Sequence, residues 1–100
     1  MVADEIIHQF FARCEETYQL LLQENALLKR HAEVPEDAFY TRKQALLDAI
    51  AGDVEQLKAV NAQQGRPQSE EARQELHACQ QKLMKIFHLD RENERLILAR

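Results

Sequence analysis

The sequence predicts an all-α protein: an elongated antiparallel helical hairpin with a long third helix, forming a three-helix, coiled-coil-like bundle. Although 45% of the 100 residues are hydrophobic, only two are glycine and two are proline, too few for the frequent turns of a sheet protein. Long stretches have apolar residues at alternating steps of three and four, as packed helices do. Breaks near Pro35 and Gly65 divide this pattern, so we expect one domain with helices over about 3–33, 36–62 and 69–99.

The first predicted helix, residues 3–33, has a regular heptad seam. Its positions are Ile7, Phe11, Cys14, Tyr18, Leu21, Asn25, Leu28 and Ala32. Further apolar residues beside the seam widen the stripe, which indicates contact with more than one neighbour. Asn25 stands where an apolar residue would be usual, and we interpret it as a core amide that sets the register. The helix should end near Glu33, because Val34 precedes a proline and is disfavoured in helical geometry.

The second predicted helix, residues 36–62, carries two overlapping apolar stripes. Their members are Phe39, Leu46, Leu47, Ile50, Val54, Leu57 and Val60. Two stripes are expected of a helix that lies between two partners, so we expect it to run between the first and third helices. Gly52 in its interior costs about 1 kcal/mol relative to alanine. Gly65 and Pro67 then stop the helix, and Ser69 is a suitable N-cap for the next one.

The third predicted helix, residues 69–99, has a seam that changes character along its length. The seam positions are Ala72, Leu76, Cys79, Leu83, Ile86, Asp90, Asn93 and Ile97. Polar residues at 90 and 93 interrupt it before a short apolar cluster, Leu96–Leu98. We therefore expect the helix to pack on the hairpin up to about Phe87 and its remaining part to meet a partner.

Several functional classes are disfavoured. The net charge of −4 and the scattered basic residues argue against nucleic-acid binding. No apolar run approaches the ~20 residues that span a bilayer, so no membrane insertion is expected. Acidic residues stand where a secretory signal would carry positive charge, and a cytoplasmic setting is the default.

Catalytic chemistry is also not indicated. His8 with Cys14, and His77 with Cys79, miss the three- or four-residue spacing of a helical metal pair, so no metal is expected. We find no nucleophile–base pair and no glycine-rich phosphate loop, so neither an enzyme nor a cofactor is expected. Cys14 and Cys79 lie on core seams and are interpreted as buried free thiols.

Two stretches resemble the FlgN family of flagellar type III export chaperones. In residues 23–50, a glutamate and a Leu-Leu pair precede a turn, and a lysine, a second Leu-Leu pair and an isoleucine follow it, as in that family. These residues are Glu24, Leu27, Leu28, Lys43, Leu46, Leu47 and Ile50. In residues 86–97, the run from Leu89 to Ile97 is similar to the family's L-N-x-x-N-x-x-L-[LI] signature, with Asp90 standing where the family has asparagine.

The resemblance implies a small cytoplasmic chaperone that binds terminal helices of hook-associated (hook–filament junction) proteins. It would prevent their early assembly and deliver them to the export apparatus. The residues expected to bind the partner are Ile86, Leu89, Asp90, Asn93, Leu96 and Ile97. Two alternatives stay open: a FliT-like chaperone of the filament cap, and a generic coiled-coil oligomerisation or adaptor module. The sequence also leaves open the client, the oligomeric state (a homodimer included), the orientation of the third helix and whether a tail follows Arg100.

Overall fold

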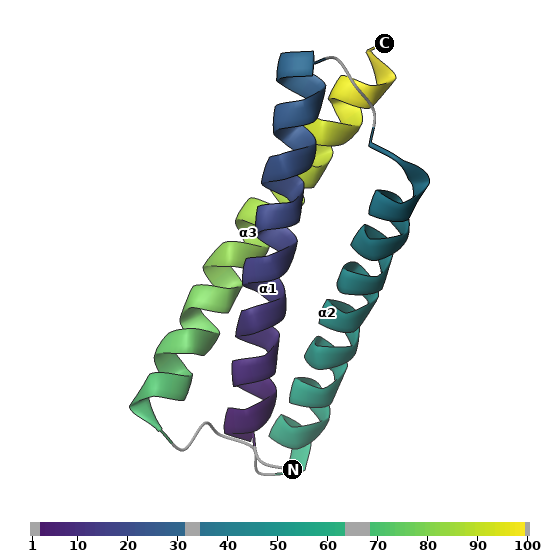
Figure 1. Cartoon of the computed structure of the whole chain (residues 1–100). Coiled ribbons are helices and arrows are strands. Elements are labelled where there is room, and N and C mark those ends of the chain that lie inside the picture. Colours follow the sequence, from purple (N-terminus) through teal and green to yellow (C-terminus); the bar gives the residue numbers. More distant parts are fainter. Residues whose placement is uncertain (1–2, 32–34, 64–68, 100) are drawn as a thin grey trace.

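The computed structural model describes residues 3–31, 35–63 and 69–99, which form a bundle of three long α-helices (Figure 1). The elements are α1 (Ala3–Ala26), the π-helical turn η1 (Leu27–His31), α2 (Asp37–Gln63) and α3 (Glu70–Leu98). The bundle measures 49 × 21 × 16 Å, and its radius of gyration of 15.5 Å exceeds the roughly 13 Å of a compact domain of this length. The predicted all-α, elongated fold is therefore confirmed.

The predicted ends of the helices can be compared with the structure only in part. The expected end of the first helix at Glu33 lies outside the described residues, as does the turn with Gly65 and Pro67. Within the described residues, α1 gives way after Ala26 to the wider π-helical turn η1. The expected cap is confirmed, because the Ser69 hydroxyl accepts a hydrogen bond of 3.0 Å from the backbone N–H of Ala72.

α1 is the central helix of the bundle, with α2 and α3 packed along it (Figure 1). α2 runs antiparallel to α1, and α3 runs parallel to it. The expectation that the second helix lies between the other two is therefore wrong. Burial gives the reason, because α1 buries residues over a wide face whereas the described side chains of α2 that are buried are Ile50 and Asp53.

The buried seam of α1 differs from the predicted one at every second position. Most of the buried residues of α1 and η1 follow alternating steps of three and four: Ile7, Phe10, Cys14, Thr17, Leu21, Glu24 and Leu28, with Ile6 and Leu20 buried beside this seam. Phe11, Tyr18 and Asn25, which were predicted at core positions, are only partly buried. Two polar residues, Thr17 and Glu24, occupy the shifted positions because both find partners. The Thr17 hydroxyl donates a hydrogen bond of 2.7 Å to the Arg13 carbonyl.

α3 buries one residue in every seven along the predicted seam. These are Ala72, Cys79, Ile86 and Asn93, each with no exposed surface. Cys79 meets Cys14 of α1, and both thiols are free and buried, as predicted. The hydrogen bond from Cys79 lowers the pKa of Cys14, although burial alone would raise it. The same hydrogen bond raises the pKa of Cys79, and burial raises it further. The two thiols thus belong to the core between α1 and α3.

Candidate partner-binding groove

An apolar groove of about 390 Å³ lies between α2 and α3. Seven of its nine lining residues are apolar. The lining consists of Leu47, Ile50, Ala51, Val54 and Glu55 from α2 and Leu83, Ile86, Phe87 and Asp90 from α3. The groove exists because both helices pack on α1, which leaves part of their facing surfaces without a helix to cover it.

Large apolar side chains stand exposed beside the groove. Met84 is 71% exposed and Phe87, which also lines the groove, is 60% exposed. Steps of three and eleven residues, close to whole turns, align Leu98 (77% exposed) with them on one side of α3. We call Met84, Phe87 and Leu98 the apolar ridge. A single exposed apolar residue needs no explanation, but a ridge that continues into an apolar groove is typical of a binding surface.

An ion pair joins the two walls at one end of the groove. The Lys43 ammonium of α2 lies 2.6 Å from the Asp90 carboxylate of α3 and 3.0 Å from the Glu24 carboxylate of α1. Burial by itself would lower the pKa of Lys43, but the hydrogen bonds and charges of Asp90 and Glu24 outweigh it and raise the pKa. Lys43 therefore stays charged and connects all three helices.

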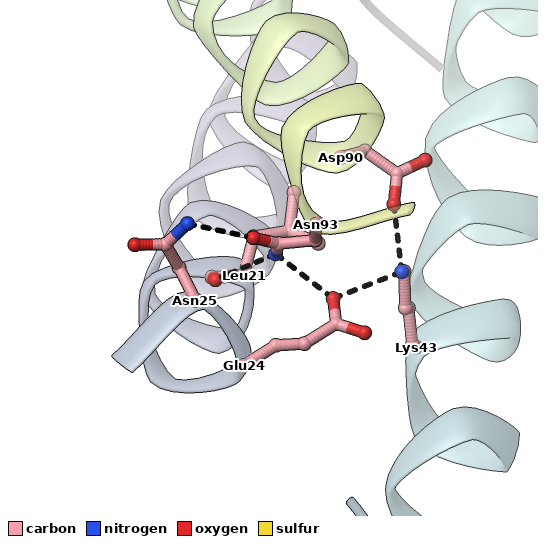
Figure 2. A network of polar contacts seen from close by, with 6 residues as sticks. All are labelled: Leu21, Glu24, Asn25, Lys43, Asp90 and Asn93. Carbon is pink, nitrogen blue, oxygen red and sulfur yellow. Dashed lines mark hydrogen bonds and ion pairs between the residues drawn. The ribbon is translucent and has the colours of Figure 1, made fainter. Parts of the chain in front are cut away.

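The same ion pair belongs to a buried polar network (Figure 2). The Glu24 carboxylate has no exposed surface and accepts hydrogen bonds of 3.0 Å from Lys43 and from the Asn93 amide. The Asn93 amide nitrogen also donates to the Leu21 carbonyl at 3.0 Å, and its oxygen accepts from Asn25 at 2.8 Å. Since a buried carboxylate is costly without such partners, the network favours one register of the helices.

The network brings together residues from both stretches that carry the family resemblance. Glu24 and Lys43 belong to the first stretch, and Asp90 and Asn93 belong to the second. Glu24 contacts both Lys43 and Asn93, and Lys43 in turn contacts Asp90. In this structure they act as links between the helices.

The structure locates the expected partner-binding residues in three different environments. Ile86 and Asn93 are fully buried, and Leu89 packs against the core. Asp90 lines the groove but is paired with Lys43. Leu96 and Ile97 are only partly buried.

The predicted limit of packing near Phe87 is therefore wrong, whereas the expectation that the end of α3 meets a partner stays a prediction. The buried seam continues through Asn93, because its amide finds partners on α1. Phe87, which was expected to pack on the hairpin, is mostly exposed.

The sequence missed the α2 wall of the groove. Leu47 and Val54 did carry a signal, since they belong to the two overlapping apolar stripes of this helix. The stripes were interpreted as contacts with two neighbouring helices, whereas Leu47 and Val54 border the groove. A second omission is Asp53, which is 1% exposed and accepts hydrogen bonds from Gln9 at 2.9 Å and Arg13 at 2.7 Å. Asp53 stands three residues after Ile50 and four before Leu57, so its position on the apolar stripe was the signal that could have identified it as buried.

Metal and membrane sites can be assessed for the part of the chain that the structure describes. Within it, no group of three or more histidine, cysteine or acidic side chains is arranged to hold a metal ion. No helix among the described residues is both long and apolar enough to cross a bilayer. Comparisons of the chain with protein-family models, curated protein sequences and solved structures find no match.

Proposed function

We propose that the chain is a cytoplasmic flagellar export chaperone that binds terminal helices of hook-associated proteins and prevents their assembly before type III export. The observation that carries the proposal is the apolar groove between α2 and α3 with the exposed ridge beside it. The resemblance of residues 23–50 and 86–97 to the FlgN family supports the choice of client. No catalytic step is part of this function.

Helix-in-groove binding is the mechanism that fits this surface. The α2 wall runs from Leu47 to Glu55, which corresponds to about 12 Å of helix or slightly more than two turns. An amphipathic client helix would insert residues spaced three and four apart between the walls. Its apolar stripe would then be covered together with Phe87, so that neither surface could drive aggregation or premature assembly.

The test is complex formation between the purified chain and a hook-associated protein or a peptide of its terminal helix. We expect a soluble complex on size-exclusion chromatography with the wild-type chain. Phe87→Asp and Ala51→Glu should abolish it, because both residues line the groove and both are exposed, so the fold can tolerate the change. Circular dichroism should show unchanged helicity for both variants.

Ala45→Glu is the matched control for Ala51→Glu, since it introduces the same charge at an exposed alanine of α2 that does not line the groove. It should leave the complex intact. If Leu96→Asp or Ile97→Asp abolishes binding while Phe87→Asp does not, the binding site is the end of α3 and the groove proposal is wrong. A chain that forms no complex with any hook-associated protein is not a chaperone of this class.

A coiled-coil oligomerisation module is the second candidate, and the apolar ridge favours it. Met84, Phe87 and Leu98 lie on one side of α3, where they could pair with a second copy of the chain. In that case light scattering would give the mass of an oligomer, Phe87→Asp would reduce it to the monomer, and no client peptide would bind.

A further inference from the structure

The α2 side of the groove is bordered by two carboxylates. Glu55 lines the groove, and Asp48 lies seven residues earlier on the same side of the helix. Both are exposed, and the small, exposed Ala51 lies between them. We call Asp48 and Glu55 the acidic lip.

The present partners of the acidic lip are weak and lie within α2. Asp48 accepts a hydrogen bond of 2.9 Å from Gln44, one turn earlier. The Glu55 carboxylate lies 3.4 Å from the Lys58 ammonium, and both side chains are at least 70% exposed. Solvent-exposed contacts of this kind contribute little to stability. Both carboxylates can therefore exchange these contacts for ion pairs with a bound helix.

The opposite side of the groove, formed by α3, carries mainly apolar side chains. Met84 and Phe87 of α3 make that side apolar as far as Arg91, which is exposed one turn after Phe87 on the same side of the helix. The other carboxylate in the lining, Asp90, is held by Lys43 at 2.6 Å, so it is less available to a ligand. A helix in the groove would thus meet an apolar floor, carboxylates along one flank and apolar side chains along the other.

We propose that the groove takes a partner helix whose apolar stripe is flanked on one side by lysine or arginine residues seven apart, and on the other by further apolar residues. This inference rests on the proposed function and specifies the kind of client helix. In packed helices, the residues that flank the apolar seam form the ion pairs that select the partner and its orientation. The acidic lip provides the complementary charges at a matching seven-residue interval.

Two model peptides test the charge preference. They share one amphipathic helical sequence and differ only at two flank positions seven residues apart, which are lysine in one and glutamate in the other. Fluorescence anisotropy of the labelled peptides gives their dissociation constants. We expect the lysine peptide to bind roughly three- to tenfold more tightly at about 0.05 M salt, and the difference to shrink at about 0.5 M.

Protein variants identify the carboxylates responsible. Asp48→Asn with Glu55→Gln raises the net charge by two, and should remove the preference for the lysine peptide. Gln19→Lys with Gln56→Lys raises it by the same amount at exposed positions that do not line the groove, and should preserve the preference. Equal binding of both peptides, or equal effects of the two double variants, would overturn the inference.

Further outcomes separate this inference from the proposed function. If the lysine peptide binds with the expected preference but no hook-associated helix binds, the inference holds and the flagellar function fails. If neither model peptide binds, the groove does not capture helices and the inference is wrong. A dimer that dissociates when the acidic lip is neutralised would make a second copy the occupant, which also contradicts the inference.

Discussion

Asn93 connects α3 to α1 through hydrogen bonds at a position where an apolar residue would otherwise pack. Its amide nitrogen donates to the Leu21 carbonyl and to the Glu24 carboxylate, and its oxygen accepts from Asn25. Glu24 has no exposed surface, so its charge depends on partners inside the chain. Losing one of them leaves a buried charge less well compensated, which costs more than an ordinary hydrogen bond.

Asn93→Ala should therefore lower the free energy of unfolding by about 2–4 kcal/mol. Urea denaturation followed by circular dichroism measures this change. Lys85→Ala, an exposed change on the same helix, should stay within about 0.5 kcal/mol of the wild type. A loss below about 1 kcal/mol for Asn93→Ala would mean that the network contributes little to stability.

Lys43 makes the stability depend on pH in the alkaline range. The pKa of Lys43 is raised in the folded chain. Its contribution to the free energy of unfolding is therefore complete at pH values below the unfolded pKa of about 10.4, and it is lost as the pH rises through the folded pKa. The stability difference between the wild type and Lys43→Met should be constant from about pH 8 to 10 and shrink above that. Urea denaturation at a series of pH values measures it, and a difference that grows with pH would contradict the assignment.

Individual residues show how far the sequence could predict the site. The heptad steps placed position 93 on the seam of the third helix, but Asn93 was predicted to bind a partner, because the steps could not reveal the partners that its amide finds inside the chain. Those partners depend on the rotation of α1 relative to α3, which also decides that Glu24 is buried and Asn25 only partly so. Sequence spacing fixes which residues share one helical face, but it carries no information on the rotation between two helices.

Among the helices, α2 is the one least enclosed by the bundle. Its buried residues among the described side chains are Ile50 and Asp53, while Leu47, Ala51 and Val54 border the groove. The sequence predicted its approximate extent and its two stripes. It could not predict that α1 is central, because both helices have apolar stripes wide enough for two neighbours. Which of them is enclosed depends on the total apolar surface that each arrangement buries.

Gly52 gives a test of α2 as an element. A Cβ atom added there would meet nothing within 4 Å, and the position is exposed. Gly52→Ala should therefore raise the free energy of unfolding by about 1 kcal/mol through helix propensity alone. The matched change Ala59→Gly, at another exposed position of α2, should lower it by a similar amount. If Gly52→Ala destabilises the chain in urea denaturation, the position has a packing role in the fold.

At the scale of the whole molecule, the bundle has three helices and an apolar groove between the outer two. A helix seated in that groove would complete a four-helix arrangement, in which the central helix α1 already supports both walls. The sequence predicted the elongated three-helix shape, but the groove follows from the position of α1, which the sequence left undetermined.

Local unfolding should also differ between the helices. Backbone amides of α2 should exchange with deuterium faster than those of α1 and α3, because α2 can separate while the α1–α3 core stays intact. Mass spectrometry of exchanged peptides measures this. Equal protection of all three helices would show that the bundle opens as one unit.

The central position of α1 also bears on how the chain folds as it is synthesised. Its most extensive packing is with α3, which follows it only after the whole of α2. A nascent chain that ends before Glu70 would expose the α1 residues that later cover Cys79 and Ile86. We therefore expect the hairpin of α1 and α2 to be prone to aggregation on the ribosome until α3 has been synthesised and can cover it.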